Sequence, residues 1–346
     1  MKKQKYALNL LLILALTGFA LWFALKDNFH QVLKCISQMN LLSLVIVLLW
    51  GVLFTAVWGF VYYVLGRKYT DHYTPSKGIL VAFIGSFFSG ITPSSTGGQF
   101  VQAYIMKKQG IKVSDGASLL WADFIIYQTT MMIYVSILFL LRFAYYSAQS
   151  AWFNIILLGY IINAVVVVAL YTIALFPSIY IKLSRILVKV LTKLHVLKNP
   201  EKTLDSWTLQ VTSFTREIKV LAKDKKSILL CVCINVVRLS LYYSLPFVIA
   251  LVLHIPLKMN EFIDVMALSS FVTMANSFIP IPGASGGTEV VFSLLFSGMM
   301  KNLTGAVLVL WRFSTYHIVL IIGGILFVFV KNHYERKESK INLEGM

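Results

Sequence analysis

The sequence predicts an all-α integral membrane protein with about six full spans, two re-entrant broken-helix hairpins in an inverted-topology repeat, and cytoplasmic N and C termini. The first observation is composition: 58% of the 346 residues are hydrophobic and 13% are charged, about half the ~25% of charged residues in a soluble domain. The second is a series of long apolar stretches, and the third is a Pro/Gly motif that occurs twice. This composition excludes a soluble, disordered or nucleic-acid-binding protein as the main interpretation.

Six apolar stretches are long enough to cross about 30 Å of hydrocarbon, which takes roughly 20 residues. The first follows a basic N-terminus that resembles the start of a signal peptide, but no small-x-small cleavage site ends it, so we expect a retained span. Together they predict a single polytopic membrane domain over residues 1–346. The predicted spans are Ala7–Leu25, Leu41–Leu65, Ala117–Leu141, Trp152–Leu175, Ser227–Leu253 and Leu303–Val330.

The positive charge of the chain is segregated between these stretches. Of the 31 Lys and Arg residues, 24 lie in residues 1–6, 66–77, 100–116, 177–226 and 331–346. Cytoplasmic loops of membrane proteins are enriched in Lys and Arg, so this pattern places both termini in the cytoplasm. The formal net charge of +17 is therefore mainly a topology signal and not a nucleic-acid footprint.

Two segments interrupt the apolar pattern and resemble each other. The motif Pro-x-x-(Ser/Thr)-Gly-Gly occurs at Pro93–Gly98 and again at Pro282–Gly287. Pro and Gly pairs at membrane depth free backbone groups that lipid cannot satisfy, so such breaks are buried in protein or line a wet cavity. An alternative is that both are ordinary kinks, because Gly and Pro are common in membrane helices.

The helical arms around each break indicate how it enters the membrane. The arms Gly78–Gly90 and Phe100–Ile105 lie between two basic segments, which predicts a hairpin entering from the cytoplasm. The arms Phe262–Ile279 and Val290–Met299 are then expected to enter from outside. Repeat one covers about 41–141 and repeat two about 227–330, and broken helices in such inverted repeats mark transporter substrate sites. Phe262–Ile279 is also long enough for a full span, which would put the second break in the cytoplasm.

Four ionisable residues are predicted inside the membrane near these breaks, where charge is costly and therefore indicates function. Arg238 and Arg312 lie near mid-bilayer, Glu289 follows the second Gly-Gly, and Asp123 lies about two turns into its span. Guanidinium groups bind phosphate in a bidentate manner, so the two Arg residues are candidates for holding an anionic headgroup. The alternative is two buried ion pairs, Arg238–Glu289 with Arg312–Asp123 or the reverse.

The Gly-Gly breaks supply a second candidate recognition element. Backbone N–H groups at a helix start point at anions, and neighbouring hydroxyls add donors. The candidate groups are the backbones of Gly97, Gly98, Gly286 and Gly287 and the hydroxyls of Ser94, Ser95, Thr96, Ser285 and Thr288.

Residues 177–226 predict a basic amphipathic cytoplasmic segment that joins the repeats. Its cations Lys182, Arg185, Lys189 and Lys193 fall on one helical face, and Leu183, Ile186, Leu187, Val190 and Leu194 on the other. This is typical of an interfacial helix on anionic lipid, while a solvated topology-fixing loop is the alternative. A second amphipathic stretch follows Pro200, with Trp207, Val211, Phe214, Ile218 and Leu221 on one side.

No catalytic triad, metal spacing, Walker motif or dinucleotide fingerprint occurs in the sequence, so we expect neither a catalytic site nor a cofactor or metal. The three cysteines, Cys35, Cys231 and Cys233, are too few for a disulfide framework.

The paired breaks, Glu289 and the stretch Trp311–Tyr316 resemble the lysylphosphatidylglycerol synthase transmembrane family, the flippase-like membrane half of the multiple peptide resistance factor, over about residues 7–332. The resemblance implies translocation of a charged or glycosylated lipid between leaflets, and a link to antimicrobial-peptide resistance. In bifunctional members a soluble domain first moves lysine from lysyl-tRNA onto phosphatidylglycerol.

Two departures from the family pattern matter. The first break usually continues Gly-Gly-Glu-x-x-Arg, and here those charged positions are Gln99 and Gln102, which weakens a charged site in repeat one and could mean a different headgroup. Only 16 residues follow Val330, so we expect the aminoacyl-transfer domain to be absent.

The sequence therefore favours a lipid flippase in a bacterial plasma membrane, for an anionic, lysyl-phosphatidylglycerol-like or glycosylated lipid. Its candidate substrate-binding residues include Gln99 besides the residues above. The alternatives are a membrane subunit of a phosphatidylglycerol lysyltransferase system with a separate catalytic partner, and an ion or solute carrier. Membrane lipids, that synthase and further copies of the chain are the expected partners, and nucleic acid is not.

Overall fold

The computed structural model describes residues 30, 34, 37, 39–92, 97–142, 150–194, 197, 199–276, 279 and 281–344. These residues are mainly helical and contain no strand. Five helical runs are long and apolar enough to cross a membrane, namely Leu41–Gly66, Val113–Leu141, Ile156–Ile173, Lys225–Val252 and Pro282–His333. Four of them overlap the predicted spans closely, and the fifth, Pro282–His333, contains the predicted span Leu303–Val330 together with the predicted arm Val290–Met299. The predicted span Ala7–Leu25 lies outside the described residues.

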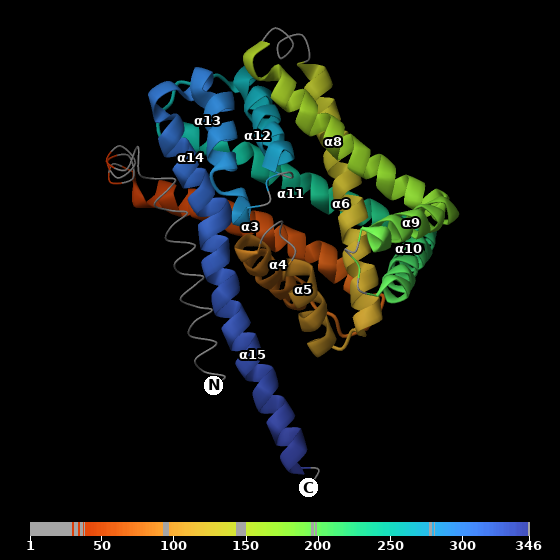
Figure 1. Cartoon of the computed structure of the whole chain (residues 1–346). Coiled ribbons are helices and arrows are strands. Elements are labelled where there is room, and N and C mark those ends of the chain that lie inside the picture. Colours follow the sequence, from red (N-terminus) through yellow and green to blue (C-terminus); the bar gives the residue numbers. More distant parts are fainter. Residues whose placement is uncertain are drawn as a thin grey trace.

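Residues 41–141, predicted as repeat one, contain four helices: α3 (Leu41–Gly66), α4 (Pro75–Ile91), α5 (Gly97–Lys108) and α6 (Val113–Leu141). The Asn40 side chain accepts a hydrogen bond from the amide of Leu42 and so caps α3. Pro75 occupies the first turn of α4, where its missing N–H costs nothing. Helices α4 and α5 pack against each other on either side of the first break, and α4 also contacts α3 and α15 (Figure 1).

The middle of the chain forms α8 (Ser150–Leu175), α9 (Pro177–Lys193), α10 (Pro200–Lys223) and α11 (Lys225–Val252). In Figure 1, α8, α9 and α10 gather on the side of the molecule away from α13 and α14. The two amphipathic helices differ in what covers their apolar faces. Phe214 of α10 is buried against Ile125 of α6. On α9, by contrast, the predicted apolar face is exposed, at Leu183, Ile186, Leu187, Val190 and Leu194.

After α11 the chain forms a short 3-10 turn, Met259–Glu261, and continues through α12 (Phe262–Asn276), a second turn η3 (Pro282–Ala284) and α13 (Gly287–Met300). After the turn Lys301–Leu303 come α14 (Thr304–Arg312), a π-helical turn (Phe313–His317) and α15 (Ile318–Glu344). Within the arm predicted over Phe262–Ile279, the described helix covers Phe262–Asn276, and Ile279 is not helical.

Helix α3 is central to the packing of both regions, since it contacts α4, α11 and the π-helical turn. The Ser314 hydroxyl donates to the carbonyl oxygen of Val47 and accepts a hydrogen bond of 3.1 Å from the amide of Gly51. A Cβ atom at Gly51 would collide with the backbone of Ser314, so only glycine permits this approach. Small residues at helix contacts are typical of membrane bundles.

An ion pair joins two helices that are far apart in the sequence. Arg142, which follows the predicted span Ala117–Leu141, is the C-cap of α6 and pairs with Asp264 of α12. The Asp264 side chain is 5% exposed and that of Arg142 is 38% exposed. The pair therefore joins the end of one candidate span to the helix that precedes the second break.

Candidate functional site

The second break is shaped by residues in the left-handed backbone region. Gly283 has φ 61° and Gly286 has φ 86°, which glycine adopts readily, and Ala284 has φ 50°, which an L-residue adopts at a cost of about 1–2 kcal/mol. These turns let the chain leave η3 and enter α13 within four residues. Strained backbone of this kind clusters at functional sites, so the break is the first place to look for one.

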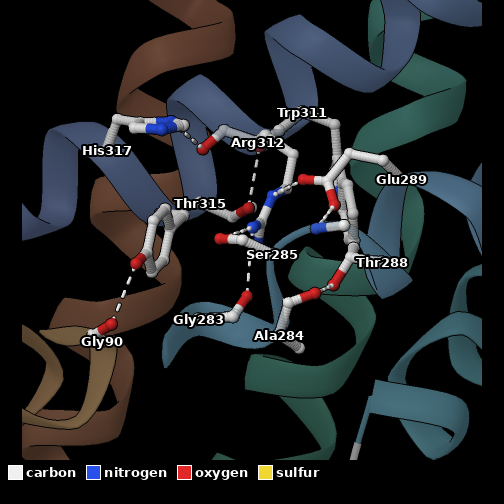
Figure 2. A network of polar contacts seen from close by, with 12 residues as sticks. Gly90, Gly283, Ala284, Ser285, Thr288, Glu289, Trp311, Arg312, Thr315 and His317 are labelled. Atoms are coloured by element: carbon white, nitrogen blue, oxygen red, sulfur yellow. Dashed lines mark hydrogen bonds and ion pairs between the residues drawn. The ribbon is translucent and has the colours of Figure 1, made fainter. Parts of the chain in front are cut away.

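An ion pair between Arg312 and Glu289 closes over this break (Figure 2). Arg312 Nε donates to Glu289 Oε1 at 2.9 Å, and the side chains are only 8% and 12% exposed. Glu289 Oε2 accepts a hydrogen bond of 2.6 Å from the Gly286 amide, which caps the start of α13. The carboxylate thus binds the helix N-terminus with one oxygen and the guanidinium with the other.

The guanidinium also binds the break directly. Arg312 Nη2 donates to the carbonyl oxygen of Gly283 at 3.0 Å and to the Ser285 hydroxyl at 3.3 Å. Thr288 donates instead to the carbonyl oxygen of Ala284, so its hydroxyl supports the turn. The sequence left open whether Arg312 pairs with Asp123 or with Glu289, and the structure shows the pair with Glu289. A buried ion pair is stable only with such additional hydrogen bonds.

Tyr316 connects this site to the first break. The Arg312 guanidinium lies 4.6 Å from the Tyr316 ring centroid, within cation–π range. The Tyr316 hydroxyl donates a hydrogen bond of 2.9 Å to the carbonyl oxygen of Gly90, near the end of α4 (Figure 2). Both Tyr316 and His317 belong to the π-helical turn, a feature found frequently at functional sites.

The first break is described only at its ends, because Ser94, Ser95 and Thr96 lie outside the described residues. The Gly97 amide, at the start of α5, donates to the Thr92 hydroxyl at 2.9 Å. Gly98 packs where a Cβ would collide with the Ser89 hydroxyl of α4. These two glycines therefore hold α4 and α5 together, which is a structural role that the sequence interpretation did not assign.

Gln99 and Gln102, the two glutamines that follow the first Gly-Gly, lie in different surroundings. Gln102 is buried and donates to the Tyr62 hydroxyl at 2.8 Å. Gln99 is exposed and lines a groove of about 540 Å³ between α5 and α6. The groove is mainly apolar, with walls from Phe100, Ala103, Tyr104, Val113, Ala117, Leu120 and Trp121 and with Lys107 as its one cation.

Asp123 and Arg238 form a second charged cluster, between α3, α6 and α11. Asp123 Oδ2 accepts a hydrogen bond of 3.0 Å from the Trp58 indole. The Arg238 guanidinium lies 5.0, 4.4 and 4.6 Å from the ring centroids of Phe54, Trp58 and Tyr127, an aromatic cage. Asp123 and Arg238 are 6% and 7% exposed, so the cluster is as deeply buried as the first.

Aromatic rings bridge the two clusters. Phe54, which contacts Arg238, has its ring centroid 4.7 Å from that of Tyr242. Tyr242 in turn lies 5.5 Å from Trp311, the neighbour of Arg312 in the chain. The structure therefore gathers the four predicted intramembrane charges into two groups, one with Glu289 and Arg312 and one with Asp123 and Arg238. Gln99, Gly97 and Gly98 belong to neither.

The sequence interpretation missed the aromatic cage, although a signal was present. Phe54, Trp58 and Tyr62 are spaced by four residues, so they share one face of α3 and all reach the Asp123 cluster. Long aromatic side chains at that spacing opposite an intramembrane Arg could have been identified as its partners. Arg142 as a partner of Asp264 had no comparable local signal, because the two residues are 122 positions apart.

The described part of the chain contains no cluster of side chains that could hold a metal ion. Across residues 39–92, 97–142, 150–194, 199–276 and 281–344, no group of three or more His, Cys, Asp or Glu side chains could hold a metal ion. The two clusters contain buried guanidinium and carboxylate groups, the kinds of group that make charge-assisted hydrogen bonds.

Comparisons with known proteins agree with this picture. The family described as "Lysylphosphatidylglycerol synthase TM region" matches residues 7–323. A "UPF0104 membrane protein" of Archaeoglobus fulgidus is 24% identical over 325 residues, covering 92% of this chain and 94% of the relative. No solved structure matches the chain. The apolar helices and these matches together make the chain a multi-pass membrane protein.

Proposed function

Because this chain belongs to the lysylphosphatidylglycerol synthase transmembrane-region family, we propose that it is a lipid flippase. It moves a lipid with an anionic, aminoacylated or glycosylated headgroup between the leaflets of a bacterial plasma membrane. Membrane lipids are then its ligands, and other copies of the chain its possible neighbours in an assembly.

The observation that carries this proposal is the buried pair of Arg312 and Glu289 at the second break. Charge inside a membrane protein marks a substrate or ion pathway by default, because it is costly to keep there. The guanidinium uses Nε and Nη2 for Glu289, Gly283 and Ser285, and within the described residues Nη1 makes no hydrogen bond. A phosphate oxygen can take that remaining donor without breaking the existing bonds.

Helix lengths support the inverted-repeat arrangement. At 1.5 Å per residue, the 17 residues of α4 extend about 25 Å and the 15 of α12 about 22 Å, less than the ~30 Å of the hydrocarbon core. We therefore propose that both broken helices enter the membrane as re-entrant hairpins, from opposite faces, with both termini in the cytoplasm. Broken helices of inverted repeats meet near the membrane midplane, where transporters bind substrate.

Two surfaces offer the lipid a way to the protein. The apolar groove between α5 and α6 fits an acyl chain and carries Lys107, whose charge complements a phosphate. The exposed apolar face of α9 and its four cations fit an anionic membrane surface, as an interfacial helix does.

The test is leaflet exchange of fluorescent anionic and lysyl-phosphatidylglycerol lipids in proteoliposomes. We expect Arg312→Ala and Glu289→Gln to slow exchange at least about tenfold, because each leaves a buried charge without its partner. Arg67→Ala, which removes an exposed arginine beyond α3, is the matched control and should retain exchange. Exchange that survives both site variants would refute the proposed site.

A second candidate is favoured by the family's description, which names a synthase. In that case the chain is the membrane subunit of a phosphatidylglycerol lysyltransferase system with a separate catalytic partner. Folded protein that exchanges no lipid alone but raises the yield of aminoacylated lipid from a co-reconstituted transferase would support this candidate over the flippase.

A further inference from the structure

Unpaired polar atoms gather between α6, α11 and α12, three helices that contact one another. Within the described residues, seven buried side-chain nitrogen or oxygen atoms make no hydrogen bond, and five of them belong to these helices. The five are Asp123 Oδ1 and Thr130 Oγ1 of α6, Arg238 Nε and the Tyr243 hydroxyl of α11, and Asn276 Oδ1 of α12. Most buried polar atoms in native proteins are hydrogen-bonded to protein or to ordered water, so such a concentration points to bound water and to a function.

Two of these helices carry polar residues at helical spacing, so that each presents a polar stripe on one face. Four residues of α6 follow one another at intervals of three or four positions: Asp123, Tyr127, Thr130 and Tyr134. Three residues of α12 do the same: Ser269, Thr273 and Asn276. The stripe on α6 extends about 16 Å along the helix, which is roughly half of the hydrocarbon core of a bilayer.

Two residues of α11 join the stripes. The Arg238 guanidinium lies 4.6 Å from the ring centroid of Tyr127 and interacts electrostatically with Asp123. Tyr243, further along α11, interacts electrostatically with Tyr127 and lies beside Thr273 of α12. The two stripes and these two α11 residues form one polar line, which begins at Asp123 and ends with α12, just before the second break.

We infer that the polar line is a proton relay, in which Asp123 binds and releases the proton, and that transport by this chain is coupled to a proton gradient. The proton binds Asp123 Oδ1, and the hydroxyls of Thr130 and Tyr243 each accept one proton while they donate another. Acidic and polar side chains form such relays inside pumps and transporters. A relay uses hydroxyl groups and single bound waters, so it does not need a cavity of headgroup size. The inference goes beyond the proposed function, because it names the energy source, and it rests on that function only for the statement that the cargo is a lipid.

The surroundings of Asp123 leave one of its oxygens able to exchange a proton. Trp58 donates to Oδ2 at 3.0 Å, whereas Oδ1 accepts no hydrogen bond within the described residues. Glu289 differs, because both of its oxygens already accept hydrogen bonds. The charged or titratable groups that interact electrostatically with Asp123 are Tyr62 of α3, Tyr127 of α6, and Cys231 and Arg238 of α11.

The first measurement is of water along the polar line. Ionising radiation turns bound water into hydroxyl radicals that label the side chains beside it, and mass spectrometry then locates the labels. In the full chain in detergent, we expect Tyr127 and Tyr243 to be labelled at least about tenfold faster than Phe292 and Phe296. The two phenylalanines are 0% exposed, like Tyr243, and stack on each other. Equal labelling of all four residues would overturn the relay, because its unpaired atoms would have no water with which to exchange protons.

The second measurement follows protons and not lipids. The full chain is reconstituted in liposomes of phosphatidylethanolamine, phosphatidylglycerol and lysyl-phosphatidylglycerol that enclose a pH-sensitive dye, and a potassium gradient with valinomycin drives protons inward. We expect the lumen to acidify at least about tenfold faster than in liposomes without protein. Asp123→Asn and Tyr243→Phe should each lose most of this flux, because asparagine cannot bind the proton and phenylalanine cannot pass it on. The matched controls are Asp205→Asn, at an exposed acid of α10, and Tyr171→Phe, at an exposed tyrosine of α8, and both should keep the flux.

The outcomes separate the relay from the flippase. Variants are compared only if they elute and melt like the wild type, and the comparison of wild-type protein with empty liposomes needs no variant. A wild-type flux no faster than that of empty liposomes, or a flux unchanged in both relay variants, would overturn the inference. Flux that depends on Asp123 without lipid exchange would leave the relay standing and remove the flippase. Lipid exchange that ignores an imposed proton gradient, by protein that carries no proton flux, would do the reverse.

Discussion

The Tyr316 hydroxyl donates a hydrogen bond of 2.9 Å to the carbonyl oxygen of Gly90, and this bond ties the helix that carries Arg312 to the end of α4. The same ring lies under the Arg312 guanidinium, at 4.6 Å, and against Gly283 of the second break. One side chain thus touches both broken segments, which are nearly 190 residues apart in the sequence. The two breaks are mechanically linked through Tyr316.

Removing only the hydroxyl isolates the link to Gly90. Tyr316→Phe keeps the ring under Arg312 but loses the hydrogen bond, and we expect the free energy of unfolding to fall by about 1 kcal/mol. Tyr316→Leu also loses the cation–π contact and should be destabilised further, by roughly another 1 kcal/mol. Denaturation in a defined detergent measures both. Equal stability of the Phe and Leu variants would contradict the role of the ring.

Gly283 should resist substitution more strongly than a glycine in ordinary helix. At φ 61° a side chain costs about 1–2 kcal/mol, and the new Cβ would also collide with the Tyr316 ring. Gly283→Ala should therefore lower both the melting temperature and the rate of lipid exchange. Gly298→Ala in α13 is the matched control, because nothing lies within 4 Å of its Cβ position. That variant should be neutral or stabilising by up to about 1 kcal/mol.

The helices could be predicted because their cause is local. The stretch Leu41–Leu65 is apolar throughout, and a window of about 20 such residues is sufficient evidence for a span. The structure gives α3 as Leu41–Gly66. The breaks could be predicted for the same reason, because the backbone preferences of Pro282 and Gly286 are properties of the residues themselves. The length of the arm Phe262–Ile279 is compatible with a hairpin or a full span, and the described helix in it covers Phe262–Asn276.

The partners within the site could not be predicted, because they depend on which helices meet. The sequence indicated that Arg312 and Arg238 are buried, but two carboxylates were compatible with either. Only the fold places α14 beside the start of α13, and α11 beside α3 and α6. Tyr316 had no signal at all as a partner of Gly90, because its hydrogen bond follows from the packing of α15 on α4.

Protonation of Asp224 at low pH should lower the stability of the folded protein. Its carboxylate accepts from the Ser227 amide and pairs with Lys68 at 2.7 Å, and hydrogen bonding to Lys68 and then to Ser227 lowers the pKa of Asp224 from 3.8 to about 2. Because the pKa is lower in the folded state, the stabilisation is complete above about pH 4 and is lost as the pH falls towards 2. Melting temperatures across this range should fall less steeply for Asp224→Asn.

The salt dependence checks that prediction. Asp224 lies near the surface, so molar salt should screen its attraction to Lys68 and shrink the difference between the wild type and Asp224→Asn. Lys68→Gln should reproduce part of the flattening. An acid profile identical in the wild type and Asp224→Asn at low salt would show that this carboxylate contributes nothing to the pH dependence.

The ion pair between Arg142 and Asp264 should respond asymmetrically to removal of its two members. Arg142→Gln removes the ion-pair partner of the Asp264 carboxylate, which is 5% exposed. We expect the free energy of unfolding to fall by about 3 kcal/mol. Asp264→Asn leaves the Arg142 guanidinium, which is 38% exposed and can reach solvent, so the free energy of unfolding should fall by only about 1 kcal/mol. The free energy of unfolding of the double variant should fall by less than the sum of the two single losses, because no charged carboxylate is then left buried without Arg142. Equal losses from the two single variants would mean that burial of Asp264 does not set the energetics of the link between α6 and α12.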